Sequence, residues 1–246
     1  MTQIVAIDWS GREKGAAEMI WLAIVSDGGL TYLDNGRDRQ EIIDDAIALA
    51  KADHRTVVGL DFAFGLPAWY AEREGWTSGR EIWDAMADRA DDLLDACEPP
   101  FWGRPGTKAQ SLGDPYRGTE EALRPRPKSV FQIGGAGAVG TGSLRGMRHL
   151  ADLSDAGFAV WPFDEPGWPL AVEIFPRLFA PTVVKNRHRA RRSFLAQSFP
   201  TNRRPFASAP PDRTTCSTPR CRRSRWPGTS TRSRRCRASS PATVGA

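Results

Sequence analysis

The chain has 246 residues, enough for one large domain or two small ones with a sizeable core. Of its 34 basic and 29 acidic residues, positions 201–246 hold eleven arginines and one acid, so positions 1–200 hold 23 basic and 28 acidic residues. The net charge of +5 therefore combines a slightly acidic body with a strongly basic C-terminal segment. The positive net charge of the whole chain is therefore no sign of a basic nucleic-acid-binding protein.

Cysteine usage disfavours a disulfide-stabilised protein, and hydropathy disfavours a membrane-spanning one. Positions 1–200 contain Cys97 as their one cysteine, so no disulfide framework is implied. Cys216 and Cys221 have C-x4-C spacing without a second pair or a nearby histidine, which disfavours a zinc site. The sequence shows no signal peptide and no apolar run long enough to cross a bilayer. We therefore expect a soluble cytoplasmic protein with no membrane partner, and we predict no protein partner.

Two similar apolar segments each end in an acid and a glycine. Residues 4–11, IVAIDWSG, predict a buried strand that carries Asp8. A carboxylate there is costly to bury unless it is paired, hydrogen-bonded or bound to a metal. Residues 56–67, TVVGLDFAFGLP, repeat the pattern around Asp61. The two segments therefore predict two carboxylates at one edge of a sheet.

Between these two strands the sequence predicts two more strands and a helix. Residues 19–25 and 30–33 are apolar runs on either side of an Asp-Gly-Gly turn, which indicates a hairpin. With the first strand they form an antiparallel meander. Residues 39–52 place their apolar side chains on one helical face. The expected order up to the second acid-bearing strand is β-β-β-α-β.

Two helices and a long irregular segment follow. Residues 67–74 and 78–97 predict helices, the second with a capping box formed by Ser78 and Glu81. Residues 98–128 are rich in proline, glycine and charge and lack periodicity. We expect them to form a loop over the acid-bearing edge, suited to stacking and phosphate contact. An aromatic plug on the core is equally compatible with this composition.

A glycine-rich stretch in the middle of the chain has two interpretations. Residues 129–133 predict a short strand, and a G-x-G-x-x-G sequence at 135–140 precedes a predicted helix over 143–156. A dinucleotide site would use these glycines for a pyrophosphate, and Asp164, after a strand over 158–163, for a ribose. Only one further strand remains to complete the sheet, so we favour a glycine turn.

The last predicted strand, residues 170–176, again holds one acid within an apolar run, Glu173. Three strands thus each carry a single embedded carboxylate, at Asp8, Asp61 and Glu173. Acids often flank strands singly. Three such coincidences favour one shared site.

Four of these segments together resemble a known family, the predicted RNase H-like nucleases of the domain of unknown function 429 family. The matching stretches are AIDWSG at 6–11, GLDFAFGLP at 59–67, FQIG at 131–134 and VEIFP at 172–176. The resemblance covers about residues 3–199. It implies an RNase H-like α/β fold: a mixed five-stranded sheet, three antiparallel strands followed by parallel ones, flanked by helices. In that fold the first and fourth strands are neighbours and hold acids for a divalent metal.

The resemblance implies a nuclease that hydrolyses phosphodiester bonds of a nucleic acid with Mg²⁺ or Mn²⁺. Asp8 would bridge two metal ions, with Asp61 and Glu173 each binding one. Each candidate for phosphate contact could instead be an ordinary solvated or structural side chain. These candidates are Ser10, Lys108, Lys128 and Arg145.

Beyond residue 200 the chain departs from the family's pattern. Residues 201–246 are rich in arginine, serine and proline, where the fold would supply a last acid from a final helix. One interpretation is a basic low-complexity arm for nucleic acid. We prefer a shifted reading frame, because third-base choices from Arg213 to Ser233 permit DDVLDAAVSALALARHVDAL, an amphipathic helix. We therefore predict a 1–200 domain without its final helix, a disordered 201–246 tail, and a weakly active or inactive chain.

Two other function classes remain open at this stage. A phosphotransferase of the related actin-like fold would place residues 8–11 against nucleotide phosphates. A non-catalytic nucleic-acid-binding protein would need no complete acid site. Metal-dependent cleavage without added ATP would separate the nuclease from both.

Overall fold

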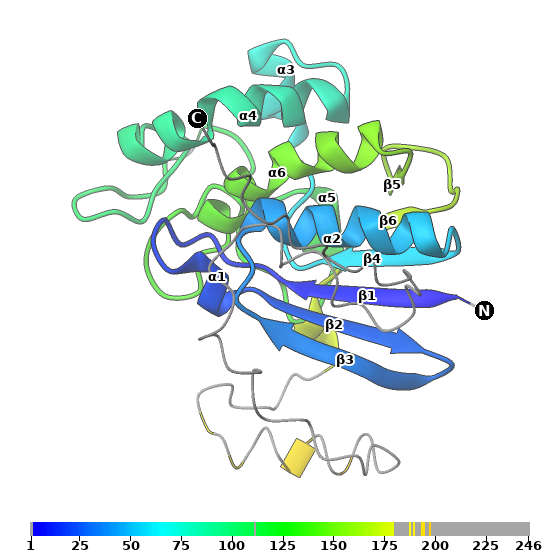
Figure 1. Ribbon diagram of the computed structural model, residues 1–246. Helices are drawn as coiled ribbons and strands as arrows, with labels where there is room; N and C mark the ends of the chain where they lie inside the picture. Colours follow the sequence, from blue (N-terminus) through cyan, green and yellow to red (C-terminus); the bar gives the residue numbers. More distant parts are fainter. Residues whose placement is uncertain are drawn as a thin grey trace, which may run out of the picture. The chain divides into compact units, whose positions relative to one another are not determined.

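The computed structural model describes residues 2–110 and 112–179, together with the single positions 187, 189, 193, 194 and 197. The predictions for residues 201–246, including the tail's disorder and the shifted reading frame, lie outside these described residues. Within them, a mixed sheet carries α-helices on one side, and Figure 1 shows α2, α6 and α4 together on that side of β1, β2 and β3.

The sheet has six strands in the order β3-β2-β1-β4-β6-β5. The strands are β1 (Gln3–Asp8), β2 (Trp21–Ser26), β3 (Gly29–Asn35), β4 (Thr56–Leu60), β5 (Ala159–Trp161) and β6 (Leu170–Glu173). The first three are antiparallel, and β1, β4, β6 and β5 are parallel neighbours, as in the predicted α/β class. The expected five-strand count is wrong, because the short strand β5 pairs with β6 at the edge and adds a sixth.

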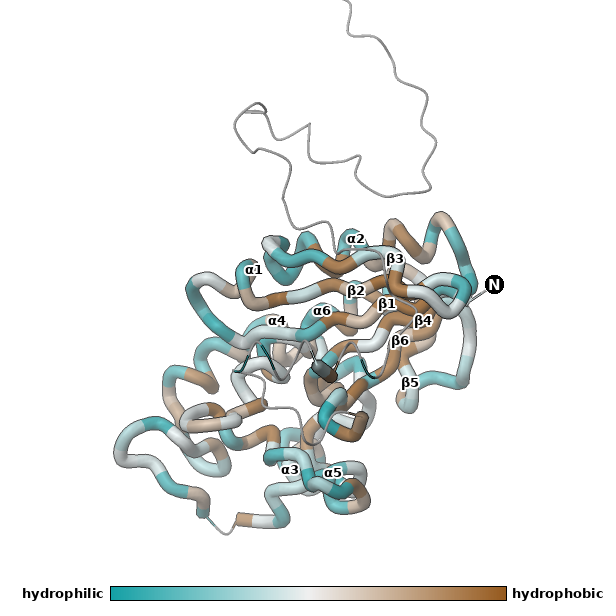
Figure 2. Tube along the Cα trace, turned by 90° about the horizontal axis from the view of Figure 1, so that it is seen from below, coloured by the Kyte–Doolittle hydropathy of each residue, from teal (hydrophilic) through white to brown (hydrophobic). Residues whose placement is uncertain are grey.

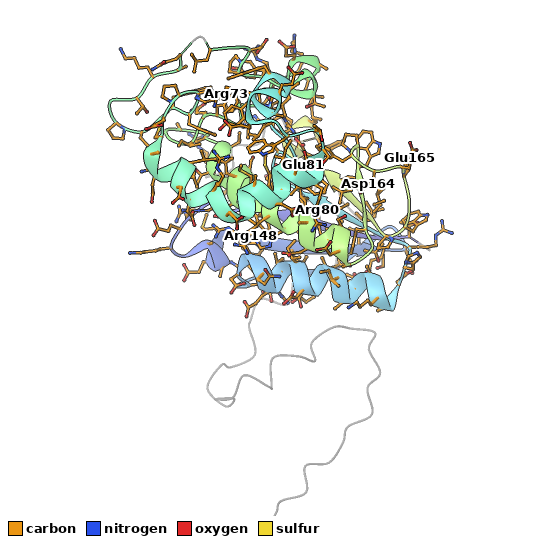
Figure 3. All side chains as sticks on the ribbon, turned by 90° about the horizontal axis from the view of Figure 1, so that it is seen from above. Arg73, Arg80, Glu81, Arg148, Asp164 and Glu165 are labelled. Atoms are coloured by element: carbon orange, nitrogen blue, oxygen red, sulfur yellow. The ribbon has the colours of Figure 1, made fainter. Side chains whose placement is uncertain are left out.

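The helices are α1 (Ala16–Met19), α2 (Arg39–Ala52), α3 (Ala68–Glu74), α4 (Gly79–Ala96), α5 (Gly118–Ala122), α6 (Gly140–Asp155) and a 3₁₀ turn, η1 (Pro176–Leu178). The longest of these, α2, α4 and α6, follow the apolar periodicity of the sequence. The predicted capping box of α4 is half formed: Ser78 Oγ accepts the Glu81 N–H at 3.2 Å, while the Glu81 carboxylate accepts the Thr77 N–H at 2.6 Å. On the outer side, Arg80 lies between Asp84 and Asp155 and joins α4 to α6 (Figure 3).

The expected strand at 129–133 is wrong. This segment makes a single isolated bridge, between Trp102 and Gln132. Ser129 Oγ accepts the Phe131 N–H at 3.1 Å and donates to the Pro115 carbonyl at 2.6 Å, which closes a turn in place of a strand ladder. The glycines that follow form a separate turn before α6, as expected, with Gly135 and Gly137 at φ angles of 82° and 73°.

One face of the sheet packs on the helices. Along β1, Val5 and Ile7 have no exposed surface, whereas Ile4 and Asp8 on the opposite face are exposed. The buried face continues through β2, β4 and β6 with Leu22, Ile24, Val58, Leu60 and Ala171. The opposing helical side chains include Ile42, Ile43 and Ala46 of α2 and Leu144, Met147 and Leu150 of α6. No helix in the described part of the chain is long and apolar enough to cross a membrane.

The start of α6 packs directly on the loop that follows β1. A Cβ added to Gly11 would lie 2.4 Å from the backbone nitrogen of Gly142, closer than real Cβ contacts. The Ser143 hydroxyl accepts the Ala63 N–H at 3.0 Å, so the same end of α6 also holds the segment after β4. These contacts fix the chain immediately after both acid-bearing strands.

We predict that Gly11→Ala lowers the free energy of unfolding by about 1–3 kcal/mol, because the new methyl meets backbone atoms that cannot rotate away. Gly118→Ala is the matched control, since a Cβ there meets nothing within 4 Å. It should change stability by less than about 0.5 kcal/mol. Chemical denaturation measures both, and equal effects of the two variants would contradict the close packing of the β1 loop on α6.

Candidate functional site

All three predicted acids lie at the same edge of the sheet. Asp8 is the last residue of β1, Asp61 directly follows β4, and Glu173 is the last residue of β6. The parallel pairing aligns Ile7 with Leu60, and the Asp61 N–H continues the ladder by donating to the Ile7 carbonyl at 3.1 Å. Asp8 and Asp61 are therefore neighbours on adjacent strands. The carboxyl edge of parallel strands is also where α/β proteins commonly bind ligands.

Strand alternation divides the three acids between two faces. Asp8 follows the buried Ile7, and Asp61 follows the buried Leu60, so both belong to the face opposite the helices. Glu173 is in register with Leu60 and shares the helix-covered face. The next residue, Ile174, confirms this alternation, because its side chain lies against Gly59 on the opposite face. The structure thus brings Asp8 and Asp61 together and separates Glu173 from them.

Glu173 is held by an ion pair that the sequence analysis did not anticipate. Arg117 Nη2 and Nη1 donate to its two carboxylate oxygens at 2.6 and 2.9 Å, and the Phe64 N–H donates to Oε2 at 3.0 Å. Bidentate Arg–carboxylate pairs are strong and geometrically specific. Glu173 is therefore a structural partner of Arg117 in this arrangement.

Arg117 also binds a second acid, the buried Glu120 at the start of α5. Its Nε lies 3.0 Å from Glu120 Oε1, and the Arg117 backbone N–H donates to Glu120 Oε2 at 2.8 Å. The Glu120 side chain is 2% exposed, and burial raises its pKa although Arg117 opposes the shift. Burial lowers the pKa of Arg117, but Glu173 and Glu120 raise it overall. The sequence signal was weak: an R-x-x-E spacing inside a segment without periodicity.

The 98–128 segment packs on the body as well as reaching the acid edge. Phe101 is 2% exposed and its ring contacts Tyr70 and Phe131. The Trp69 indole donates to the Asp114 carbonyl at 2.7 Å. The aromatic plug that the composition allowed is therefore present, and Arg117 is the residue that connects the segment to the sheet.

The other predicted site residues fall into two groups. Lys108 and Lys128 are exposed and make no hydrogen bond or ion pair with the described residues. Ser10 is 8% exposed, and Arg145 is engaged by the Asp91 carboxylate and the Gly11 carbonyl, each at 2.7 Å. Arg39 donates to the Ser10 carbonyl at 3.0 Å. The two arginines therefore hold the loop after Asp8 from the helical side.

No three-acid metal centre is assembled in the described residues, where no group of three or more His, Cys, Asp or Glu side chains is placed to hold a metal ion. Two neighbouring carboxylates still suit Mg²⁺, which proteins often bind through one or two carboxylates together with substrate phosphates. Asp8 and Asp61 fit that donor set. Glu173 does not fit it while Arg117 occupies both of its oxygens.

Comparison with family models, curated proteins and solved structures finds no match to this chain. The likeness to the RNase H-like nuclease family therefore stays a resemblance carried by four short motifs.

We predict that Arg117→Met lowers the free energy of unfolding by about 3 kcal/mol at pH 8, because it leaves Glu120 buried without its cation. This loss of stability should shrink toward pH 5. A carboxyl group whose pKa is raised in the folded state takes up a proton more readily there than in the unfolded chain, so lowering the pH stabilises the folded variant.

The control for this variant is Arg89→Met, which removes a more exposed guanidinium paired with Glu74. Its effect should stay below about 1 kcal/mol. Denaturation curves at the two pH values provide the measurement. A loss at Arg117 that is no larger than that at Arg89, or that grows on acidification, would contradict a buried Arg117–Glu120–Glu173 network.

Proposed function

We propose that the protein is a divalent-metal-dependent nuclease whose reactive centre is the Asp8–Asp61 pair. The observation that carries this proposal is their register, because the parallel β1–β4 ladder continues through Asp61 and makes the two acids neighbours on one face. Two neighbouring carboxylates are a donor set that Mg²⁺ uses in proteins, together with the phosphates of a substrate.

The chemistry of phosphodiester hydrolysis matches this donor set. A bound Mg²⁺ or Mn²⁺ would activate water and neutralise charge on the phosphate. Asp8, which is exposed, and Asp61, which is half-buried, would hold this metal ion at the edge of the sheet. The exposed Lys108 and Lys128 are available for a polyanionic substrate. Arg145 is better assigned to positioning the loop after Asp8.

Glu173 takes a different role in this proposal from the metal ligand that the resemblance implied. Through Arg117 it anchors the 98–128 segment at the end of β6, one strand from Asp61. It also accepts the Phe64 N–H, which fixes the backbone three residues after Asp61. We therefore assign Glu173 a positioning role, in which it holds the backbone after Asp61 and the Arg117 side chain.

The packing of the β1 loop disfavours an actin-like phosphotransferase. Such an enzyme would turn the backbone of Ser10 and Gly11 toward nucleotide phosphates. Here Gly11 abuts the backbone of α6, and Arg39 and Arg145 occupy the carbonyls of Ser10 and Gly11.

We predict that Asp8→Asn and Asp61→Asn each weaken Mn²⁺ or Mg²⁺ binding at least tenfold in calorimetry, because an amide cannot replace a carboxylate charge. Asp92→Asn, on an exposed position of α4, is the matched control and should leave metal affinity unchanged. Metal binding is measured first, because the unusual segment after residue 200 is predicted to leave the chain weakly active or inactive. Unchanged affinity in Asp8→Asn would count decisively against the proposal.

Cleavage is the second readout of the same variants. Single-stranded DNA, duplex DNA, RNA and an RNA–DNA hybrid should be tested with Mg²⁺ or Mn²⁺ and without ATP. Any cleavage by the wild-type chain should disappear in Asp8→Asn and persist in Asp92→Asn. Metal-independent binding of nucleic acid without cleavage would instead favour a non-catalytic binding protein.

A further inference from the structure

A tryptophan lies beside the acid pair, on the face of the sheet opposite the helices. Trp21, the first residue of β2, is in register with Asp8 on the antiparallel β1–β2 ladder. Residues directly opposite each other in such a ladder share a face, with their Cβ atoms about 5 Å apart. The next residue, Leu22, is buried against the helices, so Trp21 belongs to the other face. Trp21, Asp8 and Asp61 therefore form one row across three adjacent strands.

The Trp21 ring presents a large aromatic surface to solvent next to Asp8. Its side chain is 41% exposed, although tryptophan is highly buried on average. Its indole makes no hydrogen bond, ring contact or cation–π contact with any residue that the structure describes. The nearest positions on the same face, Ala23 and Ala6, are small and in register with each other. Figure 2, which shows the molecule from below, displays brown, hydrophobic stretches along several strands of this sheet.

The backbone holds Trp21 in a fixed position. β2 pairs with β1 on one side and with β3 on the other, where Trp21 is opposite Asn35. Asn35 Nδ2 donates to the Glu18 carbonyl at 2.7 Å, and the Ile20 N–H donates to the Ala16 carbonyl at 3.0 Å. These bonds join α1 to the start of β2 and to the end of β3. A binding side chain is placed more precisely on a paired strand than on a loop.

We propose that the substrate of the metal site is a single-stranded nucleic acid, one base of which stacks on Trp21. This inference rests on the proposed function and names its substrate class. An exposed indole can stack on any base, because every base has a π-face. In a duplex these faces are covered by the neighbouring base pairs, whereas an unpaired strand can offer them to an aromatic side chain. With Trp21 next to Asp8, the base on the ring and the phosphate at the metal would belong to the same or adjacent nucleotides.

The connection from Asp8 to Trp21 adds positive charge beside the ring. It carries Arg12 and Lys14 on either side of Glu13, and all three are exposed. The side chains of Arg12 and Lys14 make no hydrogen bond or ion pair with the described residues. Cations that follow the phosphates, together with an aromatic ring that stacks on bases, are the combination that binds single strands with little sequence preference.

Fluorescence anisotropy of labelled oligothymidylate and oligouridylate with the full-length chain and Mg²⁺ tests the proposal, and the two strands distinguish DNA from RNA. Trp21→Leu should weaken binding about tenfold, the size expected for one lost base–aromatic stack. Trp21→Phe should retain most of the affinity, because it keeps an aromatic face. Trp168→Leu is the matched control. Trp168 is also 41% exposed but precedes β6, at the opposite edge of the sheet, so its loss should leave affinity unchanged.

The measurements are made at elevated salt. The arginine-rich residues after position 200 attract any nucleic acid, and salt weakens such electrostatic binding far more than it weakens stacking. Under these conditions the wild-type chain should bind a single strand more tightly than a blunt duplex of the same length. A gel run after each titration confirms that the strand is intact.

Three results would overturn the proposal. They are wild-type affinity for the single strand in Trp21→Leu, an equal loss in Trp168→Leu, and duplex binding as tight as single-strand binding. Calorimetry should give Trp21→Leu the wild-type affinity for Mn²⁺, and a loss of metal binding there would overturn the proposal by making Trp21 structural. Failure of the metal site itself would show in Asp8→Asn, whose calorimetry does not depend on Trp21.

Discussion

The parallel pairing of β1 with β4 is the constraint on which the rest of the arrangement depends. It aligns Ile7 with Leu60 and carries the ladder one residue further, to the hydrogen bond between the Asp61 N–H and the Ile7 carbonyl. Because side chains alternate along a strand, this register decides two things together. It buries Ile7 and Leu60 against the helices and places Asp8 and Asp61 side by side on the other face. A slip of one residue would exchange the acids with the core.

The surroundings of the acid pair are fixed by polar contacts made from the helical side. Arg39 and Arg145 hold the carbonyls after Asp8, and Ser143 holds the backbone after Asp61. Glu173 and Arg117 connect the same edge to a segment more than fifty residues upstream. Such ion pairs, with Glu120 buried and Glu173 half-buried, are weak evidence for net stability. Their effect here is to hold the loops at the edge of the sheet in one arrangement.

The two faces of the sheet differ in what they contribute. The helix-covered face is a packed core, while the face opposite the helices is also apolar but carries the exposed Ile4, Leu33 and Trp161. A sheet that is apolar on both faces is the pattern of a three-layer structure. Asp8 and Asp61 lie at one end of this second face.

The sequence by itself determined the elements that local pattern controls. Apolar alternation and turn residues predicted the β-β-β-α-β order and the helices over 39–52 and 78–97, while the family resemblance implied that the first and fourth strands are neighbours. The sequence also marked Asp8 and Asp61 as acids at the end of buried strands. These signals are short-range: a period of 2 or 3.6 residues and a glycine or a cap at the boundary.

Only the tertiary structure decided how distant residues combine. Glu173 resembles Asp8 and Asp61 in sequence, yet its register with Leu60 turns it to the other face, where Arg117 binds it. The expected strand at 129–133 became a turn because the Ser129 hydroxyl replaced ladder hydrogen bonds. The strand expected over 158–163 is present as β5, but only the tertiary structure showed that it joins the same sheet as its sixth strand, beside β6. Arg117 lies in a segment without periodicity, so nothing local marked it. Strand pairing and ion pairing join residues far apart in the chain, and local pattern carries no information about which partners meet.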